Sequence, residues 1–191
     1  MAEQVTLFGR VQGSERRRIA PAWNNEETKR WSLVDARAHV ERIADEGGGC
    51  PCCGQRVQVY RRTINAGMAR ALIAMWAEVR RQCGVLDPSI EQLASTWIDV
   101  RTINVRGGDY AKLAYWGIIE STEVDGAHEK RSGWWRVTPT GAAFVLGRVR
   151  VPSAVYVYDG RVLDERDVES VSINDVVASR FSIEELLGGG R

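Results

Sequence analysis

The stretch from residue 107 to residue 147 constrains the fold more than any other part of the chain. It predicts a short helix, a hairpin and a second helix. Gly117 stands where a left-handed residue ends a helix, and strand-forming residues follow it. Asp125-Gly126 is a turn signal, and residues 134–137 (Trp-Trp-Arg-Val) form the return strand. Thr138 then caps the next helix, and a proline follows it at the first helical position, where a missing N–H has no cost.

Further helices are predicted upstream of this stretch. Residues 31–44 and 65–82 both repeat apolar side chains at helical spacing, and the second is the clearer pattern. Its apolar face is a helical stripe typical of a core helix: Met68, Leu72, Met75, Trp76 and Val79. Ser89 and Gln92 form a capping box that opens another helix.

This order resembles a winged helix–turn–helix domain, and its second half resembles MarR-type regulators. The matching steps are residues 117–120 (Gly-Ile-Ile-Glu), after the recognition helix, and residues 137–141 (Val-Thr-Pro-Thr-Gly), before the closing helix. The resemblance implies that the short helix, which Asp109 is expected to cap, is a recognition helix and that the hairpin is a wing. At barely two turns, this helix is shorter than is usual in that family. The layout is also similar to small bacteriophage proteins of unknown function, which implies a phage-encoded accessory protein.

The predicted fold class is therefore α+β, with a winged helix–turn–helix core. Four segments are expected: a flexible arm (1–30), a helix with a Cys-rich knuckle (31–62), the winged-helix domain (63–148) and a C-terminal appendage with a hairpin and short helices (149–191). From residue 53 to residue 83 six basic residues face one acid, whereas from residue 151 onward four bases face eight acids. The basic middle favours contact with phosphate, and a merely dipolar surface is the alternative.

Cys50 and Cys53 have the C-x-x-C spacing of a zinc knuckle. One such pair supplies two ligands, whereas a structural zinc takes four. The candidates for the remaining places are Cys52, His39 and Cys83, or a second copy of the chain. A metal-free turn with reduced thiols is the alternative, since no second C-x-x-C is present.

The sequence contains no nucleophile motif, phosphate-binding loop or dinucleotide fingerprint, so no enzyme is predicted. No apolar run approaches the ~20 residues of a membrane span, and no signal peptide is evident, so the expected location is the cytoplasm of a host cell. The favoured function is double-stranded DNA binding by a regulator of transcription or replication, and a homodimer is left open. The candidate DNA-binding residues are Arg106, Tyr110, Lys112, Tyr115, Lys130, Arg131, Arg61 and Arg62. The alternative is a protein-interaction module that uses the winged domain and the acidic tail to bind a host protein, in host takeover or against host defence.

Overall fold

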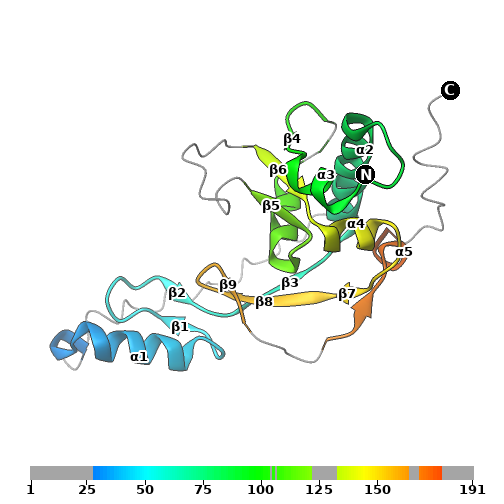
Figure 1. Cartoon of the computed structure of the whole chain (residues 1–191). Coiled ribbons are helices and arrows are strands. Elements are labelled where there is room, and N and C mark those ends of the chain that lie inside the picture. Colours follow the sequence, from blue (N-terminus) through cyan, green and yellow to red (C-terminus); the bar gives the residue numbers. More distant parts are fainter. Residues whose placement is uncertain (1–27, 104, 106, 122–132, 164–167, 178–191) are drawn as a thin grey trace, which may run out of the picture. The chain divides into compact units, whose positions relative to one another are not determined.

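The computed structural model describes residues 28–103, 105, 107–121, 133–163 and 168–177 (Figure 1). The chain divides into two compact units, residues 1–59 (unit 1) and residues 60–191 (unit 2). Both helices and strands are present, which confirms the α+β class. None of the described helices combines the length and the apolar character that a membrane span requires.

Unit 1 contains a helix and a small hairpin. A short 3-10 helix, η2 (Thr28–Arg30), precedes α1 (Leu33–Ile43), which begins at a reciprocal capping box between Ser32 and Asp35. Strands β1 (Gly48–Gly49) and β2 (Arg56–Val57) pair in antiparallel fashion. The sequence of residues 57–60 (Val-Gln-Val-Tyr) predicts a single short strand here. Instead β2 ends at Val57, because the N–H of Val59 donates to Ala44 O rather than to a neighbouring strand.

Unit 2 is built around α2 (Ala66–Cys83), which Asn65 caps at its N-terminus and which ends at the left-handed Gly84. The elements that follow it are α3 (Ile90–Ser95), β4 (Ile98–Asp99), η3 (Asp109–Trp116), β5 (Ile119–Ser121), β6 (Trp134–Val137) and α4 (Pro139–Val145). The three strands form one sheet in the order β4-β6-β5. The predicted capping box of Ser89 and Gln92 and the predicted Thr138 cap are both present.

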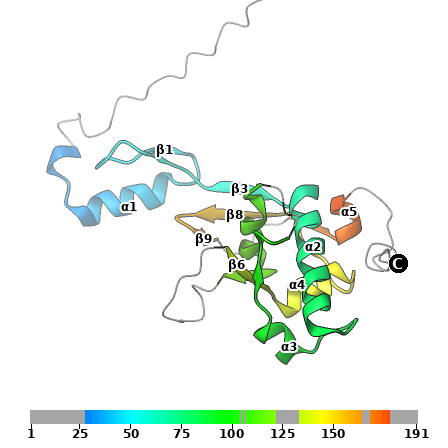
Figure 2. The same cartoon turned by 90° about the horizontal axis from the view of Figure 1, so that it is seen from above.

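Further elements between residues 151 and 177 belong to the same unit. The remaining described elements are β7 (Val151–Pro152), β8 (Ala154–Tyr158), β9 (Arg161–Val162), β10 (Ser170–Val171) and α5 (Ile173–Val177). Strand β8 pairs with β9 and with β3 (Tyr60–Thr63), as both views show (Figure 2). Val151, Ile173 and Val177 belong to the core cluster that contains the buried face of α2. Val151, Ile173 and Val177 therefore share one core with the buried face of α2 in the predicted winged segment.

Candidate nucleic-acid interface

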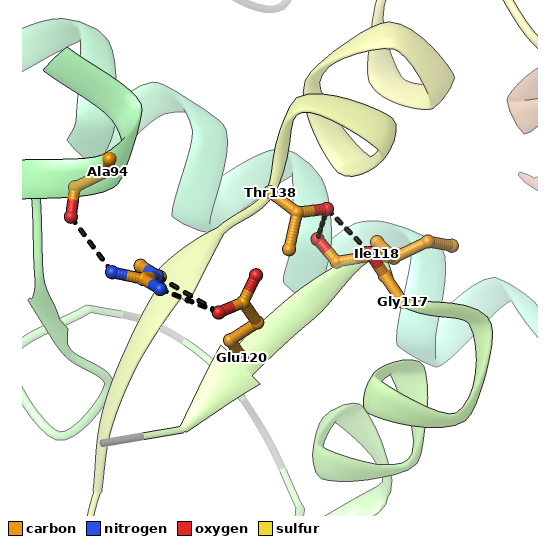
Figure 3. A network of polar contacts seen from close by, with 6 residues as sticks. Ala94, Gly117, Ile118, Glu120 and Thr138 are labelled. Atoms are coloured by element: carbon orange, nitrogen blue, oxygen red, sulfur yellow. Dashed lines mark hydrogen bonds and ion pairs between the residues drawn. The ribbon is translucent and has the colours of Figure 1, made fainter. Parts of the chain in front are cut away.

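The two segments on which the resemblance rests, residues 117–120 and residues 137–141, contact each other. Thr138 Oγ1 lies 2.6 Å from Gly117 O and 3.0 Å from Ile118 O, and the Thr138 N–H donates to Ile118 O (Figure 3). The same hydroxyl accepts the N–H of Gly141 and so caps α4. A Cβ at Gly141 would lie 2.1 Å from Ile118 O, so only glycine lets α4 approach this backbone. We call these contacts of Gly117, Ile118, Thr138 and Gly141 the clamp.

Arg136 ties the sheet to α3. Its Nε and Nη2 donate to Glu120 on β5, at 3.1 and 2.8 Å, and its Nη1 donates to Ala94 O at 3.0 Å (Figure 3). The guanidinium also lies over the Trp97 ring, 4.8 Å from its centroid. The Arg136 side chain is only 17% exposed, so its ion pair is better shielded from solvent than an ordinary surface pair. The Arg136 side chain thus links helix α3 to strands β5 and β6.

The segment expected to be a recognition helix is the 3-10 helix η3, in which side chains three apart align. One edge carries Tyr110, Leu113 and Trp116. Leu113 is fully buried, and Tyr110 meets the Trp135 ring edge-on at 5.8 Å. Trp116 donates from Nε1 to Pro152 O at 2.7 Å. This edge is directed to the interior of unit 2, so the structure uses Tyr110 for packing.

The other edge of η3 carries Asp109, Lys112 and Tyr115. The cap of η3 is Gly108 and no side chain bonds to it, so the expected Asp109 cap is wrong. Asp109 instead pairs with Lys112 at 2.5 Å. The hydrogen bond and charge of Lys112 lower the pKa of Asp109, and the charge of Arg62 on β3 lowers it further. The charges of Arg62 and Lys112 therefore both act on the Asp109 carboxylate. Tyr115 is half-buried in the same helix.

The other candidate residues are distributed differently. Arg61 and Arg62 are neighbours on a strand, so their side chains leave opposite faces of the sheet. Arg61 bonds to Thr63 Oγ1, whereas Arg62 lies over the Tyr60 ring. Of the two arginines, only Arg62 influences the pKa of Asp109, which is the ion-pair partner of Lys112. The remaining candidates lie outside the described residues: Arg106, Lys130 and Arg131.

Several exposed arginines of unit 2 already have carboxylate partners, which sequence reasoning missed. The pairs are Glu78–Arg81, Asp99–Arg101, Asp87–Arg148 and Arg150–Asp175. The i,i+3 spacing of the first pair was the one visible signal. Within the described ranges, no carboxylate pairs with Arg61, Arg70 or Arg161. Basic residue counts therefore overstate the charge that unit 2 offers to a ligand.

The predicted metal ligands are divided between the two units. The β1–β2 hairpin turns through Cys50, Cys52 and Cys53. Burial raises the pKa of the Cys50 thiol, but the N–H groups of Cys53 and Cys52 outweigh it and leave the pKa below its ordinary value. His39 meets the Trp31 ring edge-on at 4.9 Å, and its Nδ1 lies 3.4 Å from Arg42 Nη2.

Cys83 belongs to unit 2, where its sulfur lies 3.4 Å from Thr96 Oγ1. Across the part of the chain that the structure describes, no three or more His, Cys, Asp or Glu side chains are gathered as a metal would require. The cysteine-rich turn therefore offers a pair of thiols at knuckle spacing, and among the described residues no group of three metal-binding side chains completes it.

No family model matches the chain, and neither a curated protein nor a solved structure matches it significantly. Any functional conclusion therefore depends on the geometry above.

Proposed function

We propose that this chain is a phage-encoded winged-helix protein that binds double-stranded DNA, chiefly through phosphates, and regulates transcription or replication. The clamp is the observation that carries this proposal. It fixes the end of η3 to the start of α4 and so sets the base of the β5–β6 hairpin against the helix that precedes it. A rigid junction of helix and hairpin is what a winged domain needs in order to present both to a duplex.

Arg62 and Lys112 are the proposed phosphate contacts among the described residues. Together they carry two positive charges around one carboxylate, so the surface at the start of η3 keeps an excess of positive charge. Because η3 is short and one of its edges packs inward, it has few side chains for reading bases. We therefore expect binding with little sequence preference, dominated by the phosphate backbone.

The test is a fluorescence-polarisation titration of random-sequence duplex DNA over a series of salt concentrations. Binding is expected at low salt and is expected to weaken as salt rises, since bound phosphates release counterions. Arg62→Ala and Lys112→Ala should each make the slope of log K against log[salt] shallower by about 0.9, the value for one phosphate contact.

Arg70→Ala is the matched control. Arg70 is exposed on α2, has no ion pair among the described residues and lies off the buried face of that helix, against which η3 packs. Its removal should leave the slope unchanged. Absence of binding at low salt would refute the proposal, and an equal loss of slope in Arg70→Ala would refute the assignment of Arg62 and Lys112.

A second candidate function is supported by exposed apolar side chains between α2 and α3. Val85, Leu86 and Ile90 are 42%, 76% and 66% exposed, respectively. Adjacent exposed apolar side chains are typical of protein-binding surfaces. Under this second proposal, the chain binds a host protein through these side chains. The Leu86→Ser variant should then no longer copurify with that protein from host extract, while its DNA binding is unchanged. If no stoichiometric partner copurifies with the unaltered protein, this candidate fails.

A further inference from the structure

The cysteine-rich turn of unit 1 has the backbone of a metal knuckle. The N–H of Cys50 donates to Gln55 O at 2.8 Å, and the N–H of Gly54 donates to Cys50 O at 2.9 Å. Gly54 has a φ of 70°, a left-handed conformation that glycine adopts without strain. These bonds close a tight turn that carries both Cys50 and Cys53. The arrangement is suited to holding one ion by two sulfurs.

The hairpin that carries this turn is weakly supported by its own chain. Strands β1 and β2 contribute two residue pairs, and β1 consists of two glycines, which have no side chains to pack. Two-stranded hairpins are marginal in water without further support. Cys52 and Cys53 are both exposed at its tip. A metal bound by the sulfurs would supply the missing order, because binding free energy then contributes to folding.

Two sulfurs leave a tetrahedral zinc half-coordinated. In the described part of unit 1, His39 is engaged by Trp31 and Arg42, and no group of three or more metal-binding side chains is gathered. Cys83 belongs to the other unit, where it bonds to Thr96. A second copy of the chain carries the same pair of thiols in the same turn, and two such pairs supply four sulfur ligands.

We propose that one zinc ion joins two copies of this chain, with Cys50 and Cys53 of each copy as its four ligands. The four thiols release their protons on binding, which leaves a site with two net negative charges. Arg56 stands opposite Gly49, the residue before Cys50, and supplies positive charge beside each half of the site. All the ligands lie in unit 1, so the inference does not depend on the proposed DNA binding.

The test measures zinc content and molecular mass on the full-length protein, purified in a reducing buffer without chelator. Elemental analysis should give one zinc per two chains, and light scattering after gel filtration should give the mass of a dimer. Addition of EDTA should yield monomers, and zinc added afterwards should restore the dimer.

Three variants separate this site from other ways of binding zinc. Cys53→Ser should lose the zinc and the dimer, whereas Cys52→Ser and Cys83→Ser should keep both. Near-ultraviolet circular dichroism, dominated by the tryptophans of unit 2, should be the same in all three and so report that unit 2 is folded. Any of four results would overturn the proposal: a monomer at saturating zinc, one zinc per chain, loss of zinc in Cys52→Ser, or zinc retained in Cys53→Ser.

Discussion

Replacing Gly141 with alanine should destabilise unit 2, although alanine is the better helix former. A Cβ at this position would lie 2.1 Å from Ile118 O and 3.0 Å from Val137 Cγ1. The obstacle at Ile118 is backbone, which cannot swing aside as a long side chain would. Helix α4 must therefore withdraw by roughly 1 Å, and that movement strains the clamp bonds from Thr138 to Ile118 O, at 3.0 and 3.1 Å.

The size of the effect follows from three terms. Overpacking of a well-packed site costs about 1–3 kcal/mol. Losing two hydrogen bonds adds about 1 kcal/mol each. Alanine recovers about 1 kcal/mol of helix propensity. The net loss is about 3 kcal/mol, which in urea corresponds to a midpoint lower by roughly 1–2 M.

The assay is urea unfolding followed by tryptophan fluorescence, since five of the seven tryptophans lie in unit 2. Gly67→Ala is the matched control, because Gly67 also lies in the first turn of a helix and a Cβ there meets only Asn65 Oδ1, at 3.1 Å. It should change stability by less than about 1 kcal/mol, because the gain in helix propensity is offset by the small displacement of the Asn65 cap. A Gly141→Ala protein as stable as its parent would show that α4 does not need this close approach.

Three smaller predictions concern polar contacts in unit 2, each checked by the same unfolding assay. Thr138→Val keeps the shape but removes the cap and the bonds to the preceding backbone, so it should cost about 2 kcal/mol; an unchanged midpoint would contradict the clamp. Arg136→Ala should cost about 3 kcal/mol, because it leaves Glu120 without this partner in a partly buried position, and a cost below about 1 kcal/mol would show that the pair is solvent-screened. Arg148→Ala should change stability by less than about 0.5 kcal/mol, since its pair with Asp87 is largely exposed on both sides, and a larger loss would reveal a structural role.

The parts of the fold that were predicted from sequence are those determined by local chemistry. Ser89 with Gln92, Thr138 followed by proline, and Gly117 after a helix each act within a few residues, and the structure has all three as expected. The failure at Asp109 has a local cause as well. Two groups near in sequence can bind its carboxylate, an N–H of the first helical turn and the ammonium of Lys112. The ammonium is the stronger partner because it is charged.

What could not be predicted is the pairing of distant segments. Arg61 and Arg62 are adjacent in sequence, but their strand directs them to opposite faces of the sheet, and the register of β3 with β8 fixes which face each side chain takes. The role of Gly141 could not be predicted either, because it depends on the close approach of the Ile118 carbonyl, which lies far from Gly141 in the sequence. Ion pairs such as Asp87–Arg148 join residues far apart in sequence and left no pattern to read.

The pairing of β3 with β8 has a consequence for how the chain folds during synthesis. Tyr60–Thr63 leaves the ribosome well before its partner strand Ala154–Tyr158 and the core residue Ile173 are made. Until then the strand has an open edge that can pair with other chains, and contacts of such long sequence separation form slowly. Nascent and truncated chains that stop before residue 154 should therefore aggregate or be degraded. A variant truncated before residue 154 would therefore report on failed folding and not on the role of the missing residues in binding.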